Sequence, residues 1–261
     1  PDMELSRRDA IRAGGGILAG TGVAGCVEER VTNERTRVDS SGVWALSPET
    51  ADASLDRDAF ESYVGRMESK YGDSGVWGLD AETAEDFAVA YVQRLAITRE
   101  TPGDPGGTET SLEPDDIDPE APLLVTNACV AVYEPADGRR RYWLWAAADA
   151  TEGRLIRDVR VSELGATLRL REGILADAAE PSVDGEEASV GLGSPPSGTF
   201  PLRGGRLRNT RVTGERGIYG VEWDGDLDGV QSVNGVCEEE TTGEYRFFWE
   251  TSLGYSYEET V

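Results

Sequence analysis

Residues 123–148 read LLVTNACVAVYEPADGRRRYWLWAAA and carry the clearest structural signal in the chain. Residues 123–133 are rich in apolar and β-branched side chains, and PADG at residues 135–138 is a hairpin-turn signal. In the return strand, residues 141–148, the run Tyr-Trp-Leu-Trp puts large apolar groups on both faces. The pattern predicts an antiparallel hairpin that is covered on both sides.

Further strands are expected downstream of this hairpin, where short apolar runs alternate with turn residues. The expected strands cover residues 154–161, 166–171, 206–212, 217–223, 230–237, 245–251 and 253–258. With the hairpin they make about nine short strands, typical of an antiparallel sheet or sandwich. The β-rich domain is therefore expected over residues 123–261.

An internal repeat precedes this domain. SGVWALSPETA at residues 41–51 recurs as SGVWGLDAETA at residues 74–84, with eight identities in eleven positions. Ser47 and Asp80 suit helix N-caps, and Glu49 and Glu82 suit a first helical turn. Trp at such a helix entry is typical of a structural staple. A pseudo-symmetric ligand site formed by the paired turns is the alternative.

Each copy of the repeat is followed by apolar residues at helical spacing. In the first copy these are Leu55, Ala59, Tyr63, Val64, Met67 and Tyr71; in the second they are Ala84, Phe87, Ala88, Tyr91, Val92 and Leu95. Residues 41–100 are therefore expected to form a helical repeat region. The predicted fold class is α+β, with two N-terminal amphipathic helices and a predominantly antiparallel β-sheet or sandwich.

Two polar segments separate these parts. Residues 26–40 are mixed in charge with few apolar anchors, and are expected to act as a tether. Residues 101–122, rich in Pro, Gly, Thr and acidic residues, are expected to form an acidic linker, and residues 179–201 look like a similar loop.

The chain is strongly acidic, with 50 Asp and Glu against 25 Lys and Arg and a formal net charge of −25. Such a surplus repels itself at low ionic strength, and molar salt largely screens the repulsion. The composition resembles that of proteins from extremely halophilic archaea. It argues against a nucleic-acid partner, because phosphates require a basic footprint.

The N-terminal residues resemble a twin-arginine export signal. SRRDAIR at residues 6–12 contains the Arg7–Arg8 pair, residues 13–25 carry no charge, and VAGC ends at Cys26 like a lipobox. The chain is thus similar to haloarchaeal twin-arginine-exported lipoproteins. The resemblance implies a signal peptide over residues 1–25, a lipid on Cys26 and a location on the outer face of the cytoplasmic membrane.

Two cysteines remain once Cys26 is assigned to the lipid. Cys129 and Cys237 form an even pair, which suits a disulfide in an extracellular setting. The alternative is a pair of buried free thiols in apolar strands.

The absence of histidine limits the chemistry available to the chain. GDSG at residues 72–75 matches the string around the nucleophile of trypsin-like proteases, but a Ser-His-Asp triad needs His. We interpret the string as a turn, and no catalytic residue is identified.

DGDLDG at residues 224–229 is the strongest local motif for a metal. Asp224, Asp226 and Asp228 reproduce the alternating aspartates that open calcium loops, where oxygens at positions 1, 3 and 5 converge on the ion. The twelfth position of an EF-hand, normally Glu, is Gly235 here. The motif therefore indicates either a Ca²⁺ site or an ordinary polar turn.

Aromatic residues supply a second candidate site. Trp143 and Trp145, if one face of their strand were exposed, would make a stacking platform for sugar rings; otherwise they belong to the core. The adjacent basic run Arg139, Arg140 and Arg141 is expected to pair with the chain's own carboxylates.

Three functions fit the sequence. The first is a lipid-anchored surface binding module for a glycan, a calcium ion or a partner protein. The second is a carboxylate-dependent hydrolase such as a glycosidase, using two of Glu222, Asp224, Asp226 and Glu250. The third is an accessory subunit of a membrane complex. The lack of histidine favours the binding module.

Overall fold

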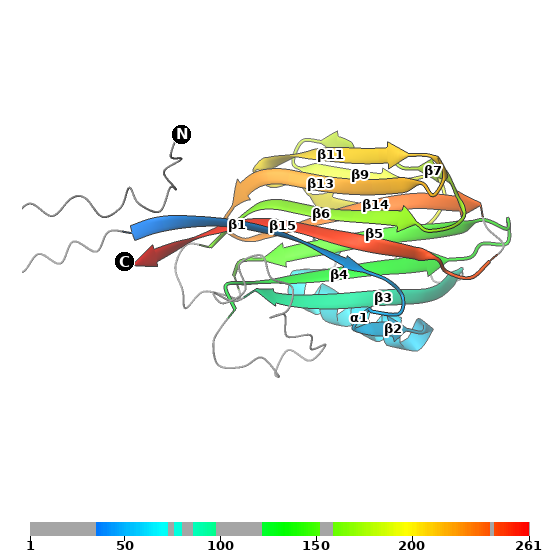
Figure 1. Cartoon of the computed structure of the whole chain (residues 1–261), viewed down its shortest axis with the longest axis horizontal. Coiled ribbons are helices and arrows are strands. Elements are labelled where there is room, and N and C mark those ends of the chain that lie inside the picture. Colours follow the sequence, from blue (N-terminus) through cyan, green and yellow to red (C-terminus); the bar gives the residue numbers. More distant parts are fainter. Residues whose placement is uncertain are drawn as a thin grey trace, which may run out of the picture. The chain divides into compact units, whose positions relative to one another are not determined.

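The computed structural model describes residues 35–72, 76–79, 86–97, 122–151, 159–240 and 243–260. These residues form the compact unit that starts at Arg35 (Figure 1). The expected signal residues Arg7 and Arg8, the lipid site Cys26, most of the tether and nearly all of the acidic linker lie outside the described residues.

Three antiparallel sheets make up this unit. The seven-stranded sheet has the order β12 (Gly214–Glu215), β7 (Ile174–Ala178), β14 (Val230–Glu240), β5 (Arg140–Asp149), β4 (Leu124–Tyr133), β3 (Phe87–Ile97) and β2 (Ala53–Leu55). The five-stranded sheet has the order β1 (Arg35–Leu46), β15 (Phe247–Thr260), β6 (Arg160–Leu170), β13 (Ile218–Leu227) and β11 (Gly205–Val212). The small sheet has the order β10 (Ser197–Pro201), β9 (Glu187–Gly191) and β8 (Ser182–Asp184).

The two large sheets pack face to face as a sandwich. Their shared core contains Tyr142 and Leu144 from β5, Trp223 from β13, and Phe247 and Trp249 from β15. The long strands of both sheets run lengthwise through the unit, and β1 pairs with β15 along its whole length (Figure 1). The first and last strands of the unit are therefore neighbours.

The other face of the seven-stranded sheet is also covered. Helix α1 (Arg57–Tyr71) and the small sheet pack there around a second core that includes Phe60, Trp77, Trp143, Trp145 and Phe200. All ten residues of β4 and all ten of β5 are buried, because both faces of these strands are packed. This agrees with the hairpin predicted over residues 123–148.

The α+β prediction is wrong, because the described unit is built mainly of strands and the second expected helix is strand β3. The segment FAVAYVQRLAI is apolar on both faces, and it pairs with β4 from Phe87 to Ile97. A strand buried on both faces loses its period of two, so its apolar positions also fit a helix. Tyr91 faces the sandwich core and Val92 faces the second core.

The first helix of the repeat is present, but it does not start at Ser47. Residues 41–46 are the end of β1, and Ser47 closes a turn in which its carbonyl accepts the N–H of Thr50 at 3.0 Å. The N-cap of α1 is Asp56, whose Oδ1 accepts the N–H of Ala59 at 3.0 Å. The two repeat tryptophans therefore lie apart: Trp44 belongs to the sandwich core and Trp77 to the second core.

Other element predictions also change. Residues 154–158 of one expected strand lie outside the described residues, and its last residues join residues 166–170 in one strand, β6. The strands expected over 245–251 and 253–258 share β15, which starts at Phe247. The expected loop over residues 179–201 contains the small sheet. Within the described residues, no helix is long and apolar enough to cross a membrane.

Candidate ligand-binding site

A cavity of about 580 Å³ lies between α1 and the seven-stranded sheet. Helix α1 contributes seven residues to its lining, β3 contributes two and β4 contributes one; these are Ser62, Tyr63, Gly65, Arg66, Met67, Ser69, Lys70, Gln93, Arg94 and Asn127. The cavity volume is in the range of small-molecule sites, roughly 300–1,000 Å³.

The helix presents its lining residues through ordinary helical spacing. Tyr63 and Met67, four residues apart, are buried against the sheet, and Arg66 and Lys70 repeat the same spacing on the flank. On the sheet, Arg94 and Asn127 are cross-strand partners in the β3–β4 pairing. One face of the helix and neighbouring residues of β3 and β4 therefore line an open cavity.

Beside the cavity, a side-chain carboxylate accepts a backbone hydrogen bond from the edge of β3. β2 pairs with β3 only as far as Val92, and the N–H of Asp52, just before β2, donates to the Val92 carbonyl at 3.2 Å. The Asp52 Oδ2 then accepts the backbone N–H of Arg94 at 2.9 Å. This carboxylate thus extends the ladder by one residue and fixes the backbone at Arg94.

The charge of the lining is the reverse of the charge of the chain. Arg66, Lys70 and Arg94 are cationic, and the described lining contains no Asp or Glu, whereas the whole chain has two acidic residues for each basic one. Arg94 is only 7% exposed. The Asp149 Oδ2 lies 3.9 Å from the Lys70 Nζ.

The aromatic residues around the cavity are held in place by polar contacts. The Asn127 Nδ2 donates to the Tyr71 hydroxyl at 2.9 Å, and the Lys70 Nζ lies 4.8 Å from the centre of the Tyr71 ring. The Arg66 guanidinium lies 5.8 Å from the centre of the Tyr63 ring. Burial raises the pKa of Tyr63 well above its usual range, so its hydroxyl stays protonated.

The aspartates of the expected calcium loop lie at the end of β13 and in its turn. Asp224 pairs with Arg208 at 2.9 Å, Asp226 pairs with Arg160 at 2.5 Å, and Asp228 with Gly229 connects β13 to β14. In the part of the chain that the structure describes, no cluster of three or more His, Cys, Asp or Glu residues could hold a metal ion.

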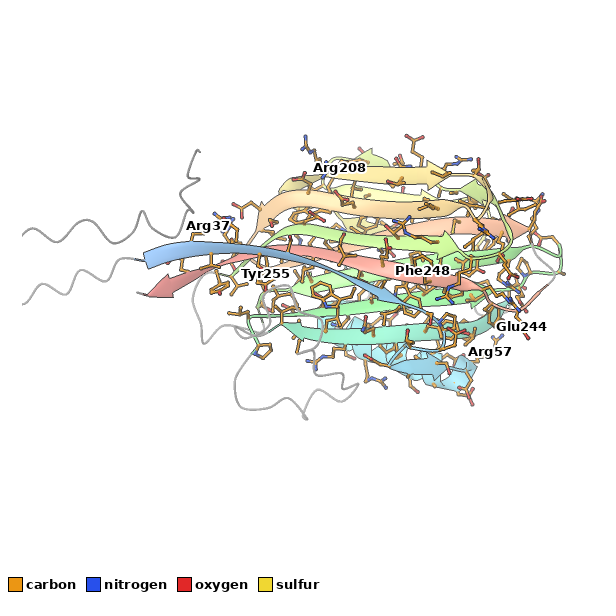
Figure 2. All side chains as sticks on the ribbon, viewed as in Figure 1. Arg37, Arg57, Arg208, Glu244, Phe248 and Tyr255 are labelled. Carbon is orange, nitrogen blue, oxygen red and sulfur yellow. The ribbon has the colours of Figure 1, made fainter. Side chains whose placement is uncertain are left out.

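The four carboxylates considered for hydrolysis lie on β13 and β15 of the five-stranded sheet. Besides Asp224 and Asp226, Glu222 pairs with Arg208 at 2.6 Å and Glu250 with Arg169 at 3.0 Å. Arg208 projects from β11, the edge strand of that sheet (Figure 2). Each of the four carboxylates thus has an arginine partner.

Trp143 and Trp145 are 0% and 1% exposed. Their indole N–H groups donate to the Asn234 Oδ1 at 2.8 Å and to the Val76 carbonyl at 2.7 Å. Both rings pack against Trp77. These tryptophans are therefore core residues with satisfied N–H groups, and they offer no surface platform for a sugar.

Cys129 and Cys237 are buried free thiols. They lie on β4 and β14, with β5 between them, and they oppose Trp145 and Tyr142, which point to opposite faces of the sheet. Two strand spacings already separate them by roughly 10 Å, beyond the Cα limit of about 7 Å for a disulfide. This arrangement does not allow the expected bridge.

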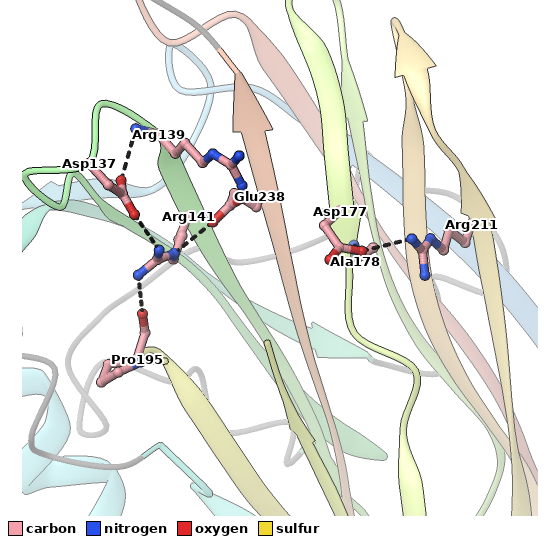
Figure 3. Close-up of polar contacts among 8 residues, drawn as sticks. All are labelled: Asp137, Arg139, Arg141, Asp177, Ala178, Pro195, Arg211 and Glu238. Carbon is pink, nitrogen blue, oxygen red and sulfur yellow. Dashed lines mark hydrogen bonds and ion pairs between the residues drawn. The ribbon is translucent and has the colours of Figure 1, made fainter. Parts of the chain in front are cut away.

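The arginine run at the start of β5 pairs with the chain's own carboxylates, as expected. The Arg141 Nε donates to the Glu238 Oε2 at 2.9 Å and its Nη2 to the Asp137 Oδ2 at 2.6 Å, while Arg139 reaches the other oxygen of Glu238 (Figure 3). Arg140 pairs with the buried Glu239 at 3.2 Å. These arginines therefore stabilise the β5–β14 pairing through ion pairs with β14.

Comparisons of the chain with protein-family models, with curated protein sequences and with solved structures find no match. The sequence alone does not indicate the cavity. Arg66 and Lys70, the only lysine, are four residues apart, and this spacing predicts that a helix would carry both on one basic flank. The position of Arg94 beside the cavity could not be predicted, because the sequence pattern of its segment predicts a helix.

Proposed function

We propose that this chain is a binding module, held on the outer face of the cytoplasmic membrane by a lipid on Cys26, that takes a small ligand into the cavity beside α1. The observation that carries this proposal is a cavity of about 580 Å³ whose described lining has three cationic side chains and no acidic one. In a chain of net charge −25, such a lining is unexpected from composition alone.

A binding role is favoured over hydrolysis for chemical reasons. The sequence has no histidine, and the described lining of the cavity offers no carboxylate as a general acid or base. Protonated Arg and Lys side chains orient a ligand, but they do not accept a proton at neutral pH.

Export and anchoring are supported by the N-terminal resemblance that Arg7, Arg8 and Cys26 carry. A docking role for the helix has less support. The large apolar side chains exposed in the described part of the chain are Val43, Ile174, Val183 and Val212, and none of them belongs to α1.

Gly65 provides a direct test of the cavity. It lies on α1 in the cavity lining, and a Cβ added there would meet no described atom within 4 Å. We expect Gly65→Leu to fill space beside the cavity while keeping the helix, and Gly65→Ala to serve as the matched control. The measurement is a thermal-shift screen of small metabolites in multimolar NaCl.

Ligands that stabilise the wild type and Gly65→Ala but not Gly65→Leu would support the proposal. If no metabolite stabilises the wild type, or if Gly65→Leu responds as the wild type does, the cavity is not a ligand site.

The anchor is tested by Cys26→Ser in intact cells. Without the thiol that carries the lipid, we expect the protein to move from the membrane fraction into the medium. Membrane retention of Cys26→Ser would contradict lipid anchoring.

A further inference from the structure

We propose that two copies of this chain associate through β1, the edge strand of the five-stranded sheet. The uncharged residues 40–46 of one copy pair in antiparallel fashion with the same residues of the second copy, with Val43 opposite Val43. The two five-stranded sheets then form one continuous sheet across a two-fold axis. This pairing makes no use of the cavity beside α1.

Exposed strand edges pair readily with other chains, and the other sheet edges in the described residues carry features that oppose such pairing. Strands β2, β8 and β12 are only two or three residues long. Strand β11 carries three arginines, and β10 ends at Pro201 and is bridged by Leu79. The middle of β1 has none of these features.

Strand β1 is long and regular. It pairs with β15 over twelve residues without a shift of register, so no bulge twists its edge away from a partner. In the part of the chain that the structure describes, β15 is the only strand that pairs with β1. Residues 40–46 read SSGVWAL and contain no charge and no proline, although 29% of the residues of the chain are charged. The outer edge of β1 therefore offers N–H and C=O groups for pairing.

Val43 adds an exposed apolar side chain to this edge. It is 61% exposed, the highest value among the exposed large apolar side chains of the described residues. The next residue, Trp44, is buried in the sandwich core, and this fixes Val43 on the opposite, outer face of the sheet. Pairing with a second copy would bring two Val43 side chains together and remove apolar surface from water.

Charge complementarity favours a second copy of β1 as the partner and sets the register. With Val43 opposite Val43, Arg37 comes opposite the turn that holds the exposed Glu49 of the second copy. Arg37 projects from β1 (Figure 2), and its contact with Asp39 at 3.1 Å uses only its Nε. The two-fold axis repeats the pair, so opposite charges flank the uncharged stretch at both ends. Centring the pairing on Trp44 would instead bring Asp39 opposite Glu49.

The oligomeric state of the full chain carrying Cys26→Ser tests this pairing. Light scattering after size-exclusion chromatography in multimolar NaCl should give twice the mass of one chain. We expect Val43→Lys to raise the dissociation constant of the dimer roughly tenfold or more, because two lysines would face each other across the two-fold axis. Val212→Lys is the matched control, since Val212 is 53% exposed on β11, the other edge of the same sheet.

Cross-linking in the Cys26→Ser chain tests the register. In Val43→Cys the two new thiols would lie opposite each other, with Cα atoms roughly 4.5–5.5 Å apart, which suits a disulfide. Ala45→Cys is the control: Ala45 is also exposed on β1, but it lies four residues along the strand from its own copy, roughly 13 Å away. We expect diamide to link Val43→Cys into a covalent dimer on a non-reducing gel and to leave Ala45→Cys unlinked.

Three results would overturn this proposal. The first is a wild-type chain that stays monomeric. The second is a dimer that Val43→Lys does not weaken, or that Val212→Lys weakens equally, because the contact would then lie elsewhere. The third is cross-linking of Ala45→Cys as efficient as that of Val43→Cys, which would contradict pairing about Val43. The Gly65 variants test the cavity separately.

Discussion

At the scale of single residues, Asp52 shows how burial changes the chemistry of a carboxylate. It lies just before β2 and accepts the N–H of Arg94 at 2.9 Å. Burial raises its pKa above the usual value of 3.8, and the hydrogen bond from Arg94 offsets part of this effect. The folded state therefore holds the Asp52 proton to a higher pH than the unfolded state does.

This difference predicts a pH dependence of stability. For an acid whose pKa is raised on folding, the favourable contribution is complete below the unfolded pKa and is lost as the pH rises through the folded pKa. We expect the free energy of unfolding of the wild type, relative to Asp52→Asn, to decrease as the pH rises from about 3.8. Asparagine keeps an oxygen that can accept the Arg94 N–H.

Urea unfolding at a series of pH values, in constant multimolar salt, measures this difference. Asp39→Asn is the control for the loss of one negative charge, because the Asp39 side chain is 76% exposed on β1. A difference between wild type and Asp52→Asn that stays flat or increases with pH would contradict the assignment.

The two cysteines give a second prediction for single residues. Burial raises the pKa of both Cys129 and Cys237, so both thiols remain protonated and poorly nucleophilic. We expect Ellman's reagent to leave the folded Cys26→Ser chain unmodified and to titrate the two remaining thiols once it is unfolded. A reducing agent should not change the unfolding midpoint, whereas a midpoint lowered by the reductant would indicate a disulfide.

At the scale of elements, two kinds of arginine pair stabilise the strands to different extents. The side chains of Arg140 and Glu239 are 6% and 3% exposed, and Glu239 also accepts the Tyr142 hydroxyl at 2.5 Å. The side chains of Arg206 and Asp224 are 74% and 36% exposed. Water screens the second pair and not the first.

Truncating each arginine should therefore have unequal costs. We expect Arg140→Ala to lower the free energy of unfolding by about 3–5 kcal/mol, because Glu239 is left as an uncompensated buried charge. Arg206→Ala should cost at most about 1 kcal/mol. Chemical denaturation measures both values.

A double variant tests the cause of the larger loss. Adding Glu239→Gln to Arg140→Ala removes the buried charge, and it should restore part of the stability. If the double variant is no more stable than Arg140→Ala, the cost comes from lost packing of Arg140 over the Tyr245 ring, which lies 4.5 Å from its guanidinium carbon.

The elements also differ in how far sequence could predict them. The β4–β5 hairpin was predictable, because a turn signal separates two apolar runs too rich in β-branched and aromatic residues for an exposed helix. Strand β3 was not predictable. Because α1 and β15 cover its two faces, both faces are apolar, and the sequence lacks the alternation of apolar and polar residues that marks a strand. The cavity could not be predicted for the same reason, because Arg94 lines it only when residues 87–97 form a strand.

At the scale of the whole molecule, the fold concentrates apolar residues in two cores and leaves the acidic surplus to the surface. Both faces of the seven-stranded sheet are covered, so its strands β4 and β5 are buried throughout and carry charged residues only at their ends. Arginine pairs on the five-stranded sheet neutralise part of the surplus, as at Glu222 and Glu250. The remaining negative charges repel one another across the surface.

This surplus predicts that stability depends on salt through screening. With a net charge of −25, self-repulsion disfavours the compact state. The screening length is about 3 Å at 1 M salt and about 10 Å at 0.1 M, so repulsion between surface carboxylates extends much farther in dilute salt. We expect the melting temperature to fall steadily as NaCl is lowered from multimolar to about 0.1 M, with NaCl and KCl nearly equivalent.

Sucrose is the control for this prediction, because it strengthens burial of apolar surface without screening charge. It should raise the melting temperature in dilute salt by less than NaCl at equal osmolality. A chain with neutralised surface carboxylates, such as Glu187→Gln with Glu240→Gln on the exposed ends of β9 and β14, should need less salt for the same melting temperature. Equal effects of sucrose and NaCl would assign the salt response to apolar burial and contradict a role for the net charge.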